Sequence, residues 1–375
     1  MPEPDEKREL GGLARSIDAL FSRTARAPAV ETPASGSLSA GLGLEEEPPT
    51  GAPSEPPGME LEDAVEAFLA GTPGAADDVR SLATKLQERL ALDPLADAVE
   101  RLVGGADGTS NLDTVALARE VIDPAVASRL VQRMGHEEDD EKRAAYVVLS
   151  ARLGMVMAKA FRGALTDSTD TRACRAYYDG LIAMGDTSRP VIEAMIEDEN
   201  RFLVRNAVTI LGEIGGDGAV GLVTSTLANT DARVRCEALG ALAKLGGEDS
   251  GQLVLASLED PDAKVRAAAA VAAGELRLER ALKPILGLLD QADDPSDLVS
   301  LLRGLGRLGD PGAVQAIEKR ATTSLFSKPP TEVRVAAYRA LHEIGTPHAR
   351  ALIEQARDDK DAVVRTTARG LASAT

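Results

Sequence analysis

Aspartate and arginine recur four residues apart in the C-terminal part of the chain. The pairs are Asp231 with Arg235, Asp262 with Arg266 and Asp361 with Arg365, and Arg334 stands at the corresponding place in a further copy. Carboxylate and guanidinium groups at this spacing lie on one face of a helix, where they could serve acid–base chemistry or anion binding. Because the pair returns in copy after copy, it cannot mark a single active site.

We interpret these residues as a structural repeat ladder. An aspartate at a helix N-terminus accepts backbone N–H bonds and complements the helix dipole. An arginine one turn later can fork to that aspartate or to the cap of the adjoining unit. Because the pairs are expected to be partly buried, removing one partner should cost more than the value of an exposed pair, which is below about 1 kcal/mol.

Other residues capable of chemistry are few. The three histidines are His136, His342 and His348, and none has a second ligand one turn away in a zinc pattern. The chain has no nucleophile elbow, dinucleotide fingerprint or phosphate-binding loop. Cys174 and Cys236 fall inside expected helices as small apolar residues, which favours a reducing compartment. We therefore expect no catalytic, cofactor-binding or metal-ligating residues and no cofactor.

A Val-Arg pair returns about every thirty residues through the C-terminal two-thirds of the chain. It occurs at Val204-Arg205, Val234-Arg235, Val265-Arg266, Val333-Arg334 and Val364-Arg365, with weaker versions at Cys174-Arg175 and Val299-Ser300. A fixed period of this size is typical of a solenoid of stacked helical units.

One unit is clearest at residues 231–258. Asp231 can cap a helix whose apolar positions include Val234, Ala238 and Leu242, and Gly246-Gly247 can end that helix before a second one follows. Similar patterns repeat from about residue 111 to the end. We predict an all-α fold, an α-solenoid of about eight helical-hairpin repeats with an N-terminal disordered extension.

The repeated pattern Asp-x-x-Val-Arg-x-x-Ala-x-x-Ala-Leu-x-x-Leu-Gly resembles HEAT repeats, particularly the bacterial kind similar to those of phycobilin lyases. The resemblance covers roughly 260 residues. It implies that the second helices of the units line a concave surface that holds another protein.

Four regions differ in composition. Residues 1–26 contain a short amphipathic interaction helix, and residues 27–58 form a Pro/Gly-rich acidic linker that we expect to be disordered. Residues 59–110 contain three helices, which either cap the solenoid or form degenerate repeats. Residues 111–375 form the HEAT-repeat solenoid.

The composition limits the partners of the chain. The net charge is −18, the aromatic content is 2%, and there is no tryptophan. The solenoid lacks the basic stripe and the stacking rings that nucleic acids require, so we expect no direct nucleic-acid binding. No signal sequence and no transmembrane segment are recognisable, which favours the cytoplasm.

The N-terminal helix carries the most specific indication of a partner. Its apolar stripe contains Leu13, Ile17, Leu20 and Phe21. A helix of about fifteen residues that is joined to the rest of the chain by a flexible tether usually folds when it binds a partner. Docking onto the chain's own solenoid and binding to a membrane surface are the alternatives.

This segment, Gly12-Leu-Ala-Arg-Ser-Ile-Asp-Ala-Leu-Phe21, resembles the N-terminal motif of the chromosome-partitioning protein ParB. The resemblance implies contact with a ParA/MinD-like ATPase, with Arg15 supplying positive charge near the nucleotide. The residues expected to bind the partner are Gly12, Leu13, Arg15, Ile17, Asp18, Leu20 and Phe21.

Two long connections interrupt the repeat period, at residues 290–297 and 322–330. The second contains Leu325 and Phe326, which either tuck onto the core or face a partner.

Together these observations predict a non-enzymatic scaffold or adaptor. The solenoid binds one protein partner, and the tethered helix binds a second, for which a ParA/MinD-like ATPase is the candidate. The alternative is a bilin-lyase-like or other HEAT-repeat enzyme, which would need an aromatic-walled pocket with an acid. Tyr146, Tyr177, Tyr178 and Tyr338 are instead expected at core positions.

Overall fold

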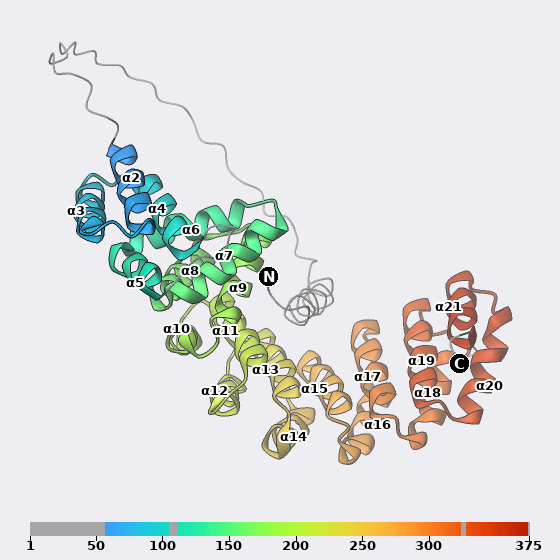
Figure 1. Ribbon diagram of the computed structural model, residues 1–375. Coiled ribbons are helices and arrows are strands. Elements are labelled where there is room, and N and C mark those ends of the chain that lie inside the picture. Colours follow the sequence, from blue (N-terminus) through green and yellow to red (C-terminus); the bar gives the residue numbers. More distant parts are fainter. Residues whose placement is uncertain (1–56, 105–111, 324–327, 374–375) are drawn as a thin grey trace, which may run out of the picture. The chain divides into compact units, whose positions relative to one another are not determined.

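A computed structural model describes residues 57–104, 112–323 and 328–373. Over these ranges the chain forms α-helices and short 3-10 turns and contains no β-strand (Figure 1). The all-α fold class is thereby confirmed. None of the helices in the described ranges is long and apolar enough to cross a membrane.

Twenty α-helices follow one another in these ranges. They are α2 (Pro57–Leu69), α3 (Ala75–Glu88), α4 (Leu92–Gly104), α5 (Leu112–Val121), α6 (Pro124–His136), α7 (Asp140–Leu153), α8 (Met155–Asp167), α9 (Thr171–Ala183), α10 (Arg189–Ile196), α11 (Arg201–Ile214), α12 (Ala219–Thr226), α13 (Ala232–Leu245), α14 (Gly247–Ala256), α15 (Ala263–Glu275), α16 (Leu282–Gln291), α17 (Pro295–Leu308), α18 (Val314–Ala321), α19 (Thr331–Ile344), α20 (Pro347–Gln355) and α21 (Ala362–Ser373).

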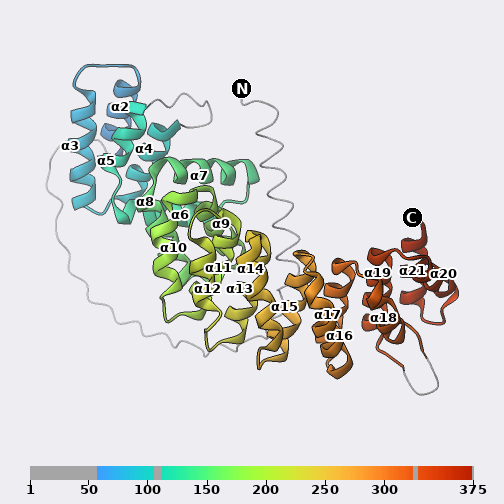
Figure 2. The ribbon, with the colours of Figure 1, turned by 90° about the horizontal axis from the view of Figure 1, so that it is seen from below.

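The helices stack in two rows. Each odd-numbered helix from α3 to α19 packs against the next odd-numbered helix, and the even-numbered helices from α2 to α14 do the same (Figures 1 and 2). We call them the first row and the second row. From α5 onward the helices form eight consecutive pairs, and α21 ends the first row. This arrangement is the solenoid expected from the repeat period.

Local signals in the sequence explain where α13 begins and ends. The Asp231 side chain accepts a 2.8 Å hydrogen bond from the backbone N–H of Arg233. Gly246 ends the helix with φ at 68°, a left-handed conformation that favours glycine. Between these caps, Val234, Ala238 and Leu242 are fully buried. Burial of a side chain such as Leu242 stabilises the fold by about 1.5–3 kcal/mol.

Small residues bring neighbouring helices of the first row unusually close. A Cβ atom added to Gly304 of α17 would lie 2.3 Å from the carbonyl oxygen of Ala270 in α15. A Cβ added to Gly274 of α15 would lie 2.4 Å from the carbonyl oxygen of Gly304. The two backbones therefore touch at a point where only glycine fits, which explains glycine inside a helix despite a cost of about 1 kcal/mol there.

The helices α2, α3 and α4 coincide with the three that the sequence predicts between residues 59 and 110. They continue both rows, since α2 packs on α4 and α3 packs on α5. Their buried side chains, among them Leu61, Val79 and Leu95, belong to the same core as those of the later repeats. The three helices are therefore continuous with the rest of the array. Of the regions predicted at 1–26 and 27–58, residues 1–56 lie outside the described residues, and residues 57 and 58 belong to α2.

Candidate interaction surface

Position in the helix determines what each residue of the Val-Arg pair does. Counted from the first residue of the helix, Val and Arg occupy positions 3 and 4 of α13, α15, α19 and α21. In α11, which starts at Arg201 after the cap Asn200, Val204 and Arg205 occupy positions 4 and 5. The alignment of Val204-Arg205 with the other pairs is therefore wrong by one residue. The N-cap residue, and not the identity of the pair, determines which positions are equivalent.

The weak pair in α17 is displaced in the same direction, by two residues. Asp294 caps this helix, so position 4 is Leu298, and Val299-Ser300 occupies positions 5 and 6. Leu298 is buried. An apolar side chain therefore replaces the arginine in α17, as Val204 does in α11.

The position-4 arginine joins consecutive repeats. Arg235 donates from Nε to Oδ2 of Asp260 at 2.9 Å and from Nη2 to Oδ1 at 2.8 Å. Its Nη1 also donates to the carbonyl oxygen of Asn229 in its own repeat at 2.9 Å. Asp260 lies two residues before Asp262, the cap of the next first-row helix. The arginine thus pairs neither with its own cap Asp231 nor with the next cap, the two partners that the sequence suggested.

Arg334 in α19 makes the same arrangement in a later repeat. Its guanidinium forks to Asp359, with the Nη1–Oδ1 distance at 3.2 Å, and Asp359 stands two residues before the cap Asp361. Hydrogen bonds from these arginines hold the pKa values of Asp260 and Asp359 below their usual range. Sequence reasoning missed both aspartates, although their fixed position before the cap was visible in the repeat.

The cap aspartates serve their own helices. Asp262 accepts from the backbone N–H of Lys264 at 2.8 Å, and Asp361 accepts from that of Val363 at 2.9 Å. Backbone hydrogen bonding by Arg233 lowers the pKa of Asp231. Asp231 also pairs with Arg201 of the preceding repeat at 2.9 Å. These carboxylates are engaged within the array.

Position 2 of the first-row helices is exposed in six successive repeats. We call this set the position-2 strip; its members are Phe202, Arg233, Lys264, Ser296, Glu332 and Val363. Phe202 is 43% exposed and Val363 57% exposed, so the strip has an apolar side chain at each end. Within the described part of the chain, Arg233 and Lys264 form no ion pair. The strip presents six different side chains at structurally equivalent places.

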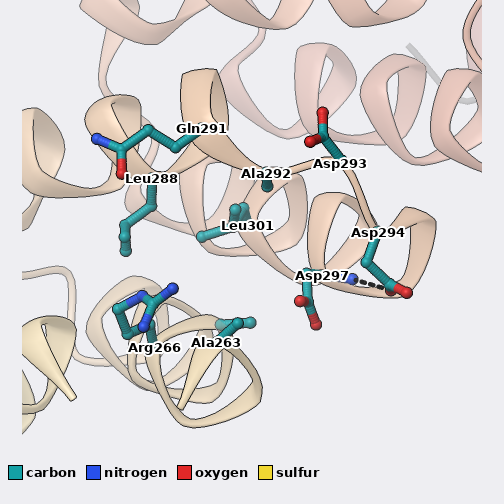
Figure 3. Close-up of a pocket in the computed structure, with 10 residues that line it drawn as sticks. Ala263, Arg266, Leu288, Gln291, Ala292, Asp293, Asp294, Asp297 and Leu301 are labelled. Atoms are coloured by element: carbon teal, nitrogen blue, oxygen red, sulfur yellow. Dashed lines mark hydrogen bonds between the residues drawn. The ribbon is translucent and has the colours of Figure 1, made fainter. Parts of the chain in front are cut away.

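A cavity of ≈ 240 Å³ opens beside this strip, between α15 and α17. Arg266 and Ala263 line it from α15, and Asp297 and Leu301 line it from α17 (Figure 3). The loop residue Ala292 completes it. Burial and the nearby Asp294 raise the pKa of Asp297 above its usual value.

Arg266 differs from Arg235 and Arg334 in its partners. Its Nη1 donates to the carbonyl oxygens of Asp260 at 2.7 Å and Pro261 at 3.0 Å. No described residue accepts from its Nε or Nη2. The place of Asp260 and Asp359, two residues before the next cap, is taken here by Ala292.

The remaining residues capable of chemistry lie apart from this surface. His348 contacts Glu318 at 2.9 Å, and His136 and His342 lie at the ends of α6 and α19. Among the described residues no three metal-ligating side chains come together. Cys174 and Cys236 are half-buried free thiols, and burial raises the pKa of Cys236 to about 11.

The four tyrosines pack into the helix array. Tyr177, Tyr178 and Tyr338 are buried, and Tyr146 is half-buried and donates to Glu100 at 3.0 Å. Burial is the largest cause of the raised pKa of each phenol.

Two sets of residues that the sequence analysis singled out lie outside the described residues. The first is the N-terminal set Gly12, Leu13, Arg15, Ile17, Asp18, Leu20 and Phe21. The second is Leu325 and Phe326 in the connection between α18 and α19.

Comparisons with known proteins give the family of the repeats. The model of HEAT repeats matches four overlapping segments, 188–274, 220–303, 251–327 and 282–372. A search of curated proteins finds no match. Solved structures with a similar arrangement include an engineered protein, with 15% identity, a TM-score of 0.36, and coverage of 84% of this chain and 98% of that chain.

Two natural proteins are also similar. The complex of CpcE and CpcF of phycocyanin lyase from a Nostoc species has 18% identity and a TM-score of 0.35, with 68% of this chain and 94% of that chain covered. The YibA protein of Escherichia coli has 13% identity and a TM-score of 0.35, with 68% and 96% covered. The family match rests on the sequence itself, and it shows HEAT repeats in residues 188–372, which is just under half of the chain.

Proposed function

We propose that the chain is a non-enzymatic scaffold whose repeat array binds a protein partner along the position-2 strip. The observation that carries this proposal is the contrast between positions within one repeat. Positions 3 and 4 of α13 and α19 keep the same Val-Arg pair, in which the valine is buried in the core and the arginine bonds within the array. Position 2, directly beside them, is exposed in every repeat from α11 to α21 and differs in each.

The chemistry of the strip fits a protein partner. Phe202 and Val363 offer apolar contact area at the two ends, and Arg233 and Lys264 offer unpaired cations between them. A surface that mixes apolar anchors with charges at regular spacing matches the composition of protein interfaces. It is unlike a phosphate-binding surface, because it holds only two cations and Glu332 adds a negative charge.

Site-specific photo-crosslinking tests which face binds. A benzophenone amino acid at position 264, in the strip, should capture the partner in cells. The same amino acid at position 248, exposed on the second-row helix α14, is the matched control. Capture from position 248 and not from position 264 would contradict the proposal and favour the second row.

We further propose that the N-terminal segment holds a second partner, a ParA/MinD-like ATPase. The support is the sequence alone: the apolar stripe through Leu13, Ile17 and Leu20, and Arg15 in the ParB-like motif. ATP hydrolysis by such an ATPase should rise on addition of the full-length chain and should not rise with Arg15→Ala. Arg26→Ala, outside the motif, is the control. An equal effect of wild type and Arg15→Ala would remove the ATPase from the proposal.

A further inference from the structure

Three first-row arginines stand at position 4 of a helix that is followed by another repeat, and only two of them have an aspartate as acceptor in that next repeat. Arg235 and Arg334 each fork to an aspartate two residues before the next cap, Asp260 and Asp359. For Arg266 that residue is Ala292. The repeat that contains α15 and α16 thus keeps the arginine and lacks its carboxylate.

The Arg266 guanidinium is nevertheless held in place. Its Nη1 donates to two carbonyl oxygens of its own repeat, those of Asp260 and Pro261, at 2.7 and 3.0 Å. Arg235 makes the same kind of bond to Asn229 in addition to its fork. Arg266 therefore keeps the hydrogen bonds from Nη1 that hold it to its own repeat. Its Nε and Nη2 have no acceptor among the described residues. An arginine fixed in this way loses little further entropy when it binds a carboxylate.

The space left by the missing carboxylate is the cavity of ≈ 240 Å³ between α15 and α17. A water molecule takes about 30 Å³ in the liquid, so the cavity has room for a short side chain. Leu301, Leu288 and Ala292 supply apolar lining that would exclude water around a bound group. In Figure 3 Arg266 lies on one wall and Asp297 on the opposite wall.

Asp297 restricts what can enter. Its carboxylate, together with those of Asp293 and Asp294 in the lining, opposes the binding of a free anion. A ligand that presents a carboxylate to Arg266 and a cation or N–H donor to Asp297 satisfies both walls. An aspartate followed by a lysine in a peptide has this pattern, whereas a free inorganic anion does not.

We infer that this cavity binds an acidic side chain of a protein partner, whose carboxylate occupies the position that Asp260 and Asp359 occupy in two other repeats. The inference rests on the proposed scaffold function and names one place where the partner is held. The cavity adjoins the position-2 strip, because Ala263 and Asp297 of its lining flank Lys264 and Ser296 in sequence.

The test uses the full-length chain labelled with nitrogen-15 arginine, and Arg266→Lys identifies the Nε–H resonance of Arg266. The probe is the peptide acetyl-Gly-Asp-Lys-Gly-amide, and its Asn version is the matched control. The Arg266 resonance should shift and saturate with the Asp peptide, at a Kd about tenfold lower than with the Asn peptide, since a charge-assisted forked pair is lost in the control.

Two variants at residue 292 complete the test. Ala292→Asp should shift the Arg266 resonance without peptide and abolish the response to peptide, because it restores the internal pair. Ala292→Asn fills the same space without charge, and it should block the peptide while leaving a smaller shift. Circular dichroism verifies that both variants fold.

Three results would overturn the inference. These are equal binding of the Asp and Asn peptides, an undiminished response in Ala292→Asp, or an Arg266 resonance that moves in Asp297→Asn as if an internal carboxylate had been removed. Each of them would leave the scaffold function standing, because that function is tested by crosslinking from the strip and not by this peptide.

Discussion

Arg235 and Asp260 join two consecutive repeats through two parallel hydrogen bonds of 2.9 and 2.8 Å. The side chains retain only 12% and 13% of their exposure, so this pair differs from a surface salt bridge. The aspartate belongs to the loop before the next cap, and the arginine is anchored to its own loop. The pair therefore fixes how one repeat meets the next.

Asp260→Asn should lower the free energy of unfolding by about 2 kcal/mol near pH 7. Loss of one partner of a fully buried pair costs roughly 3–5 kcal/mol, and the residual exposure of this pair reduces the figure. Chemical denaturation followed by circular dichroism gives the difference. Asp249→Asn, exposed on α14, is the control and should change stability by less than about 0.5 kcal/mol.

The pH dependence of this difference has a defined sign. Arg235 lowers the pKa of Asp260 in the folded state, so the carboxylate stabilises the fold above its unfolded pKa of about 3.9. This contribution is lost as the pH falls through the lower folded pKa. Wild type and Asp260→Asn should therefore converge in stability below about pH 4. A difference that grows on acidification would contradict the assignment.

Gly304→Ala should destabilise the chain by about 1–3 kcal/mol, although alanine normally favours a helix. The new methyl group would lie 2.3 Å from the Ala270 carbonyl oxygen, so α15 and α17 would have to separate. Thermal unfolding measures the effect. Gly240→Ala on α13 has nothing within 4 Å and should instead stabilise by up to about 1 kcal/mol. The same sign for both substitutions would refute the close contact.

Leu242→Asp should disturb several repeats at once. Leu242 is fully buried in the core that α13 shares with its neighbours, and an unpaired carboxylate there is strongly unfavourable. Because each repeat is stable only through its neighbours, hydrogen exchange should increase in α11 and α15 as well as in α13. Increased exchange confined to α13 would argue against cooperative stacking.

The sequence predicts the repeats well because their signals are local. A cap aspartate, buried Val and Leu at helical spacing, and a glycine such as Gly246 lie within one helix and depend on no distant residue. The one-residue error at Val204-Arg205 has the same origin, since identical letters concealed the cap Asn200, which starts α11 one position earlier relative to the pair.

The contacts between repeats were harder to predict. The partner of Arg235 lies 25 residues away in a loop, and only the stacking of α13 on α15 brings Asp260 to it. The cavity at Arg266 arises from Ala292. The role of this residue becomes clear only because the equivalent residues Asp260 and Asp359 accept hydrogen bonds from Arg235 and Arg334. The position-2 strip likewise emerges only when the helix starts are known.

The most direct measurement of the central claim is the affinity of the crosslinked partner for two charge-reversed chains. Arg233→Glu/Lys264→Glu changes the middle of the position-2 strip, and Glu248→Lys/Asp249→Lys changes exposed residues of the second row. Isothermal titration should show binding weakened about tenfold or more by the first double substitution and unchanged by the second. Unchanged binding by the strip variant, with loss in the second-row variant, would contradict the account.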